Sequence, residues 1–261
     1  MNSPETPIYN KSKILYGMNL NKNEIIDSKY VIIVEGYLDL IQLYQAGFKN
    51  VLAVSGTAFT QYHATAISKL CKTIYLAYDG DKAGQDAGIR AGYIILKNNM
   101  EPKIIQMPDG LDPDDWVQNE GPDPFKKGIQ EAKGLINFHY EIESKLFETD
   151  QNKIDFINKV ILELMNIENP LNLELSIKKL SEITGFDINS ILQTIKINKT
   201  KKNKYKQINQ PKTSQIISNK NNISSIEKEL INFCFTNDSD LRVIIKNNLN
   251  VEWLESDLIK E

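Results

Sequence analysis

Three carboxylic acids in the first third of the chain are spaced so that they could bind a metal ion. Asp79 and Asp81 stand two residues apart directly after the apolar run 74–78, and Glu35 directly follows the apolar run 31–34. The carboxyl ends of parallel strands share one sheet edge, where open α/β sheets bind ligands. The Asp-Gly-Asp segment alone fits equally well a turn in which Asp81 caps the next helix. A metal site is favoured because a second predicted strand also ends in an acid, Glu35.

Acids brought together in this way repel one another and raise one another's pKa, and a divalent cation removes that penalty. Oxygen ligands without His or Cys point to Mg²⁺ or Mn²⁺, which also bind phosphates. Asp39, one helical turn after Glu35, either joins the cluster or favours a helix N-terminus. Asp112 and Asp114, on either side of Pro113, either form a polar turn or extend the acidic site.

The elements expected to position these acids alternate between strand and helix. The β-branched run 31–34 is typical of a parallel strand buried on both faces, and apolar residues at helical spacing follow it. Short connections between such elements indicate a parallel sheet with right-handed crossovers. Strands are predicted at 31–34, 51–54, 74–78 and 103–107, and later helices at 125–132, 135–146, 154–165, 173–183 and 188–197.

Composition restricts the classes of function. The formal net charge of −3 gives no general attraction to nucleic acid, so such binding must come from local patches. Cys71 and Cys234 are far apart, and His63 and His139 are the only histidines, so no zinc site is expected. No segment has the length and apolarity of a membrane span, and no signal sequence is legible. We therefore expect a cytoplasmic protein without a membrane partner.

Four segments resemble, in order and spacing, the Toprim domain of bacterial DNA primases of the DnaG type. The segment 2–6 (NSPET) and the residues up to Gly17 resemble the end of that family's N-terminal core subdomain. The Glu and Asp-x-Asp acids are shared with topoisomerases and some nucleases, whereas the full set favours primase. The four segments are 34–39 (VEGYLD), 55–58 (SGTA), 78–84 (YDGDKAG) and 108–114 (PDGLDPD).

The resemblance implies a Toprim-like α/β fold, a four-stranded parallel sheet with flanking helices followed by an α-helical subdomain. It implies synthesis of short RNA primers from ribonucleoside triphosphates on a single-stranded DNA template, by nucleotidyl transfer dependent on Mg²⁺ or Mn²⁺. The metal ligands would be Glu35, Asp79 and Asp81, with Asp39, Asp112 and Asp114 in the extended acidic site.

Three further residues are candidates for binding nucleotide or nucleic acid. Lys11 matches a basic residue near the family's active site and either contacts a phosphate or is an ordinary exposed lysine. Tyr37 either lines the site or packs under it. Arg90 faces the same sheet edge only if its helix has a suitable rotation.

The resemblance also suggests how the chain is divided. We expect a remnant of the N-terminal core subdomain, a Toprim domain, a helical subdomain, a flexible linker and the start of a C-terminal domain that binds the replicative helicase. The linker is rich in lysine and has no acid, so it is either a solvated tether or a nucleic-acid-binding tail. The corresponding residues are 1–28, 29–120, 121–197, 198–225 and 226–261.

The family's zinc-binding domain and most of its template-gripping subdomain are not expected in this sequence. Three hypotheses follow: a primase catalytic core, a catalytically incomplete module that binds metal and nucleotide in the primosome, and a strand-cleaving Toprim enzyme. The last needs a nucleophilic tyrosine in topoisomerases, and the context of none of the 11 tyrosines singles one out.

Overall fold

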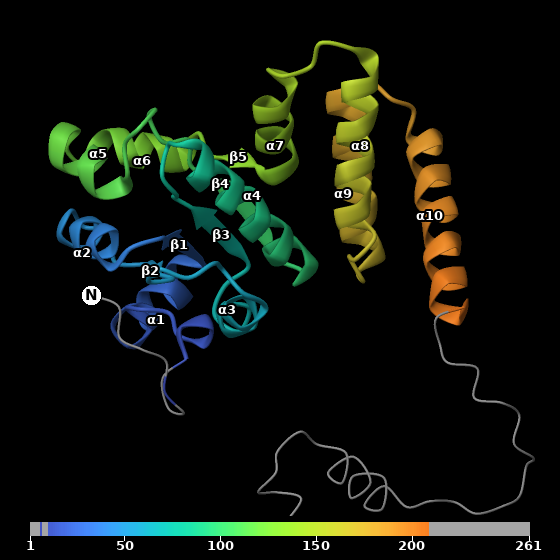
Figure 1. The fold of residues 1–261 in the computed structure, drawn as a ribbon. Helices are drawn as coiled ribbons and strands as arrows, with labels where there is room; N and C mark the ends of the chain where they lie inside the picture. The colour runs from blue at the N-terminus through green and yellow to red at the C-terminus, as the bar shows by residue number, and fades with distance from the viewer. Residues whose placement is uncertain (1–5, 7–9, 209–261) are drawn as a thin grey trace, which may run out of the picture. The chain divides into compact units, whose positions relative to one another are not determined.

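The structure is a computed structural model that describes residue 6 and residues 10–208 (Figure 1). The chain divides by its internal contacts into two compact units, Met1–Lys204 and Tyr205–Glu261. The elements described below belong to the first unit, except for the end of the last helix. The helices predicted at 226–235 and 241–249, and the helicase-binding region with them, lie outside the described residues.

A five-stranded sheet forms the centre of the first unit. Four parallel strands lie in the order β2-β1-β3-β4, which confirms the predicted parallel sheet, and a short β5 pairs antiparallel with β4. The central strand β1 is a β-branched run, and its residues from Val31 to Val34 have no exposed surface. The strands are β1 (Tyr30–Val34), β2 (Val51–Ala53), β3 (Thr73–Leu76), β4 (Glu101–Ile104) and β5 (Lys133–Gly134).

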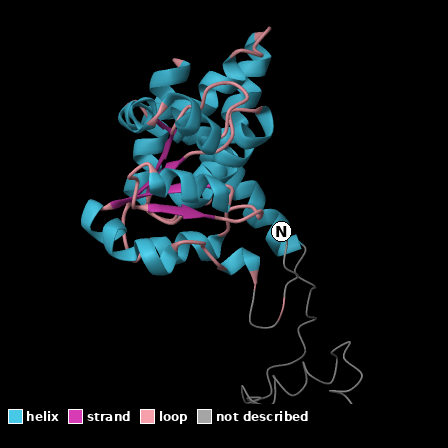
Figure 2. Cartoon of the chain, turned by 90° about the vertical axis from the view of Figure 1, so that its left-hand side faces the viewer, coloured by secondary structure: helices cyan, strands magenta, loops and turns pink. Residues whose placement is uncertain are grey.

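Helices cover both faces of the sheet (Figure 2). Side chains of β1 alternate between the two faces: Ile32 belongs to a core cluster with residues of α2, α5 and α6, and Ile33 to a cluster with residues of α1, α3, α4 and α7. The bounds are η1 (Lys11–Lys13), α1 (Met18–Ser28), α2 (Tyr37–Gln45), α3 (Gln61–Ile67), α4 (Lys82–Lys97), α5 (Pro113–Glu120), α6 (Pro122–Gln130) and α7 (Leu135–Ser144).

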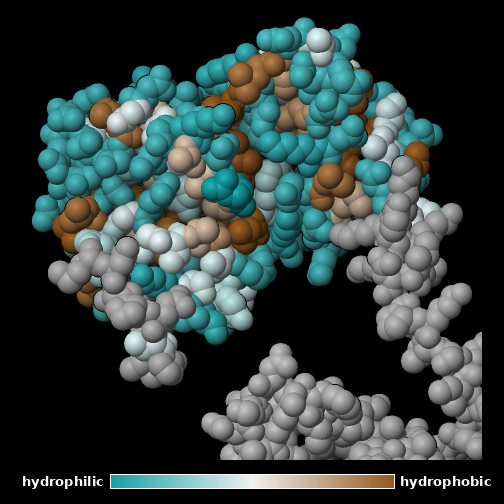
Figure 3. Space-filling model, in the orientation of Figure 1, coloured by the Kyte–Doolittle hydropathy of each residue, from teal (hydrophilic) through white to brown (hydrophobic). Residues whose placement is uncertain are grey.

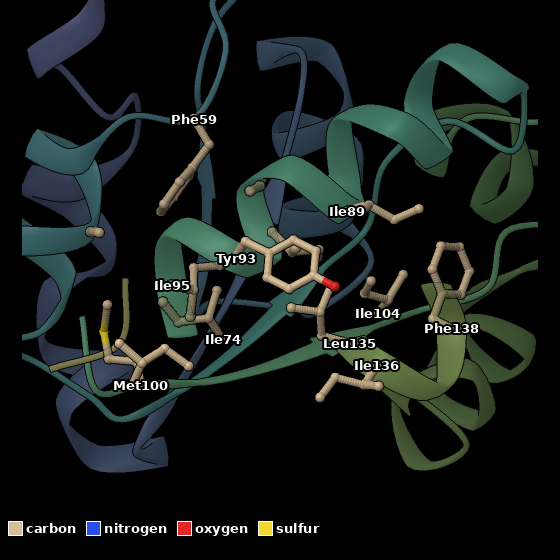
Figure 4. Packing of buried hydrophobic residues seen from close by; sticks show 14 of the residues in the cluster. Phe59, Ile74, Ile89, Tyr93, Ile95, Met100, Ile104, Leu135, Ile136 and Phe138 are labelled. Atoms are coloured by element: carbon tan, nitrogen blue, oxygen red, sulfur yellow. The ribbon is translucent and has the colours of Figure 1, made fainter. Parts of the chain in front are cut away.

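The longest helix in these layers, α4, links the sheet to the helices that follow it. Figure 4 shows Tyr93 and Ile95 of α4 among side chains of β3, β4 and α7. The same core continues into α8 (Asp150–Leu164), α9 (Pro170–Thr184) and α10 (Ile188–Ile208) through residues such as Phe156 and Leu180. The helical region thus shares a hydrophobic core with the sheet.

Three local predictions need correction. Residues 198–208 were expected in a linker, but α10 continues through them, because this segment contains helix-forming lysines and no Gly or Pro before Pro211. α1 was not predicted, because its apolar residues lack helical periodicity. α5 was not predicted, since the segment was interpreted as either a polar turn or part of the acidic site, although Asp112 followed by Pro113 is a typical helix start.

Among residues 6 and 10–208, no helix has the length and apolar composition needed to cross a bilayer. The face of the molecule in Figure 3 is mostly hydrophilic, with separate apolar patches.

Two glycines allow the loop after β3 to lie against its neighbours. The Gly80 N–H donates to the Leu111 carbonyl at 2.9 Å, which joins this loop to the loop after β4. A Cβ atom at Gly80 would lie 2.1 Å from the Pro108 carbonyl oxygen, and one at Gly84 would lie 2.4 Å from the Asp79 carbonyl oxygen. Only glycine permits these approaches, which set the position of both acidic loops.

We therefore expect Gly80→Ala to lower the free energy of unfolding by about 2 kcal/mol, because the backbone at Pro108 must move. Urea denaturation followed by circular dichroism measures the change. Gly134→Ala is the matched control, since a Cβ there meets nothing within 4 Å. Equal stability of the two variants would contradict the proposed close packing of the loops.

Candidate metal centre

Glu35 occupies the position directly after β1, at the sheet edge that carries the other acids. Its side chain is half-buried, and Oε1 is enclosed without a hydrogen-bond partner among the described residues. Burial raises the pKa of Glu35 to about 7, and the charges of Asp79, Asp39 and Asp81 add to the rise. The acids predicted to converge after β1 and β3 therefore do interact.

Asp79 and Asp81 follow β3 and start α4. Asp81 caps that helix, with Oδ1 accepting a hydrogen bond from the Gly84 N–H at 2.7 Å. Burial raises the pKa of Asp79, and the charges of Asp112 and Asp81 raise it further. The two interpretations of this segment are compatible, because Asp81 caps a helix and still acts electrostatically on the other acids.

Asp39 also has both of the roles considered for it. It is 7% exposed, and Oδ2 accepts a hydrogen bond from the Gly36 N–H at 2.9 Å in the first turn of α2. Burial raises the pKa of Asp39 to about 6, the hydrogen bond from Gly36 opposes that rise, and the charge of Asp112 adds to it. Asp39 thus stabilises the start of α2 and lies in the acidic cluster.

Asp112 and Asp114 differ in their relation to the cluster. Asp112 caps α5 through a 2.6 Å hydrogen bond from the Asp115 N–H, and its charge raises the pKa of both Asp39 and Asp79. The Asp114 side chain instead accepts from the Gln118 side chain at 2.6 Å, along α5. The backbone of Asp114, rather than its carboxylate, interacts with the cluster: its N–H donates to the Asp39 carboxylate and lowers the pKa of Asp39.

The candidate nucleotide-binding residues lie in different places. Arg90, on α4, is exposed and lines the same groove as the acids, so the helix has the rotation that its proposed role requires. Lys11 is the first residue of η1. The next residue, Ser12, accepts a hydrogen bond at its carbonyl from the hydroxyl of Thr60, which precedes α3. The ring of Tyr37 packs against that of Tyr16, with centroids 6.1 Å apart.

The acids open onto a groove of about 510 Å³ beside α4. It is lined on one side by Glu35, Asp79 and Asp81, with Arg90 further along the helix. Two residues of the quoted segments 55–58 and 78–84, to which no role was assigned, lie at or beside this groove. Tyr78 lines the groove, and Ser55, in a left-handed conformation at φ +55°, turns the chain after β2. Their positions depend on strand register, which no local pattern reveals.

The donor set fits a hard divalent cation, although the acids as placed do not enclose one. Among the described residues, no group of three His, Cys, Asp or Glu side chains has the arrangement to hold a metal ion. Asp39, Asp81 and Asp112 each direct one oxygen at a backbone N–H. The unpartnered Glu35 oxygen and the mutually raised pKa values mark an excess of negative charge that Mg²⁺ or Mn²⁺ would offset.

Known proteins provide an independent comparison. Residues 32–117 match a family model described as Toprim-like. The chain is 36% identical over 198 residues to the DNA primase of Clostridium acetobutylicum, an alignment that covers 75% of this chain and 33% of that protein. It is 40% identical over 138 residues to the DNA primase of Helicobacter pylori, covering 53% and 25% of the two chains. The chain thus spans about a third or less of the length of these relatives.

Solved structures share the fold. A DNA primase domain from Pseudomonas aeruginosa superimposes with a TM-score of 0.67 at 32% identity, covering 75% of this chain and 63% of that one. The catalytic domain of a DnaG primase bound to single-stranded DNA gives a TM-score of 0.62 at 26% identity, covering 70% and 60%. Both comparisons extend beyond the family match into the helical region.

The raised pKa of Glu35 has a consequence for stability. The pKa is about 7 in the folded chain and near 4.5 in an unfolded chain, so the unfolded state loses its proton first as pH rises. Glu35 therefore lowers the stability progressively between pH 4.5 and 7. We expect Glu35→Gln to stabilise the metal-free protein at pH 8 by on the order of 1 kcal/mol, allowing for solvent screening.

Denaturation in the presence of a chelator, at pH 5 and pH 8, measures this effect. Glu174→Gln, on the exposed side of α9, is the control and should follow the parent protein at both pH values. A Glu35→Gln variant no more stable than the parent at pH 8 would contradict the electrostatic strain at this edge.

Proposed function

We propose that this chain contains the catalytic core of a primase. The proposal is supported by the match to a Toprim-like family model and by the similarity to bacterial DNA primases over the Toprim core. The primase reaction is the template-directed joining of ribonucleotides into short RNA primers on single-stranded DNA. The observation that carries the proposal is the convergence of Glu35 with Asp79 and Asp81 on a groove that also contains Arg90.

Metal dependence is general among Toprim and primase proteins, and here the ligands would be Glu35, Asp79 and Asp81 binding Mg²⁺ or Mn²⁺. When bound, the metal would supply charge neutralisation at the triphosphate and activation of the primer 3′-hydroxyl. The contribution of the chain is to gather oxygen ligands that repel one another and to keep them half-buried. Such a site has its own charge balanced only when a cation is present.

The other acids have supporting roles in this proposal. Asp112 adds negative charge to the cluster, and Asp39 adds charge while fixing the start of α2 behind Glu35. Asp114 would join only if its side chain left Gln118. Arg90 is the basic residue in the groove lining and would bind the nucleotide's phosphates.

The proposed partners follow from the reaction: a single-stranded DNA template, ribonucleoside triphosphates, the RNA primer and, through residues 226–261, a replicative helicase. Support for the template is the match to a DnaG catalytic domain bound to single-stranded DNA. Lys11 and Tyr37 are proposed nucleic-acid contacts outside the acidic groove. Ser12, next to Lys11, accepts a hydrogen bond from the Thr60 hydroxyl, and the ring of Tyr37 packs against that of Tyr16.

A second candidate is a module that binds metal and nucleotide without synthesising a primer. It rests on the same acidic groove, which can bind a metal ion and a nucleotide without a held template. Synthesis of RNA requires a held template as well as a metal site. The two candidates therefore predict the same metal-dependent nucleotide binding and differ in whether a product forms.

A primer-synthesis assay tests the first candidate. The chain is incubated with radiolabelled ribonucleoside triphosphates, single-stranded DNA and Mg²⁺ or Mn²⁺, and we expect short RNA products that disappear when the metal is chelated. Asp79→Asn should reduce synthesis about a hundredfold or more, because a metal ligand is lost without a change of shape. Asp155→Asn, an exposed acid on α8, should leave the rate unchanged.

The alternative outcomes separate the candidates. Metal-dependent nucleotide binding without product, at any chain concentration, would replace the first candidate with the second. Robust synthesis by Asp79→Asn would contradict both, because the acidic edge would then not be the metal site.

A further inference from the structure

Tyr78 and Glu35 follow the neighbouring strands β3 and β1, just beyond the ends of the strands. In the parallel pairing of β1 with β3, Ile33 is opposite Leu76, and continuing that register by two residues places Glu35 opposite Tyr78. Both follow the alternation of Val31, Ile33, Ile74 and Leu76, so their side chains leave the same sheet face. Adjacent strands are about 4.8 Å apart, which brings the two side chains within reach of each other.

The Tyr78 hydroxyl and one carboxylate oxygen of Glu35 are buried and have no hydrogen-bond partner among the described residues. Tyr78 is 7% exposed, and its hydroxyl makes no hydrogen bond with any described residue. Oε1 of Glu35 is enclosed and unpartnered in the same way. A buried hydroxyl without a partner is costly, and native proteins retain few of them. An unpaired donor and an unpaired acceptor that follow neighbouring strands on one sheet face indicate a hydrogen bond that forms in another state of the site.

The residues around the Tyr78 hydroxyl show which of two neighbouring cavities it is associated with. Tyr78 lines both the acidic groove and a smaller pocket between α4, β4 and α7. Burial is the main cause that raises the Tyr78 pKa; the charge of Glu35 raises it further and that of Arg90 lowers it. Both residues line the acidic groove and neither lines the smaller pocket. The hydroxyl thus belongs electrostatically to the acidic groove.

We propose that Tyr78 is a positioning residue for the metal site, whose hydroxyl donates a hydrogen bond to the carboxylate of Glu35 when a divalent cation is bound. This inference rests on the proposed metal site. A cation keeps Glu35 ionised, and an ionised carboxylate is a strong acceptor for a tyrosine hydroxyl. Partners of this kind orient metal ligands, and their loss typically weakens metal binding by about ten- to a hundredfold.

Two substitutions with the same chemical change test the proposal. Tyr78→Phe removes only the hydroxyl oxygen, and so does Tyr93→Phe, whose hydroxyl already bonds His139 Nδ1 at 2.9 Å between α4 and α7. Mn²⁺ affinity is measured by electron paramagnetic resonance, which counts free ions without any need for activity. The unfolding temperature is measured separately in the presence of a chelator.

For Tyr78→Phe we expect about tenfold weaker Mn²⁺ binding and an unfolding temperature without metal that is equal to or above the parent value. Tyr93→Phe should give the reverse, with unchanged Mn²⁺ affinity and a lower unfolding temperature, because a bond present in the folded chain is lost.

Unchanged Mn²⁺ affinity in Tyr78→Phe would overturn the proposal, and so would a loss of metal-free stability like that of Tyr93→Phe. Glu35→Gln distinguishes this failure from failure of the site itself. If the parent binds no Mn²⁺, or if Glu35→Gln binds it as tightly as the parent, the metal site and the inference fall together. If Glu35→Gln weakens Mn²⁺ binding but Tyr78→Phe binds Mn²⁺ as tightly as the parent, only the proposed role of Tyr78 is wrong.

Discussion

The rest of the structure depends on the repulsion between carboxylates that a parallel sheet brings to one edge. β1 and β3 are neighbours, so the residues after them, Glu35 and Asp79, must lie close together. Burial raises the pKa of both. The charges of Asp79, Asp39 and Asp81 raise that of Glu35 further, and those of Asp112 and Asp81 raise that of Asp79. This edge cannot be explained by stability alone, because apolar or uncharged polar residues at the same positions would relieve the strain.

The fold partly compensates for the repulsion with helix N-termini. Asp39, Asp81 and Asp112 each accept a hydrogen bond from a backbone N–H at the start of α2, α4 or α5. Glu35 has no such partner for Oε1. This carboxylate oxygen is therefore free to bind a cation, and the glycines at 80 and 84 keep the surrounding loops close to it.

Much of this edge could be predicted from the sequence, because strong local patterns specify it: β-branched runs for β1 and β3, and acids directly after them. Features that depend on distant contacts could not. β5 is two residues long and exists only through its pairing with β4, and the preference of Asp114 for Gln118 follows from the geometry of α5. The role of Tyr78 required the register of β1 with β3, since a tyrosine ending an apolar strand is ordinarily a core residue.

The most direct test of the acidic edge is to locate Mn²⁺ by anomalous X-ray diffraction from crystals of this chain soaked in the metal. We expect an anomalous peak in contact with the carboxylates of Glu35 and Asp79, with Asp81 beside it and the groove along α4 open towards Arg90. Crystals that bind Mn²⁺ only elsewhere, or that show no peak at this edge under saturating metal, would contradict the assignment of these acids as a metal site.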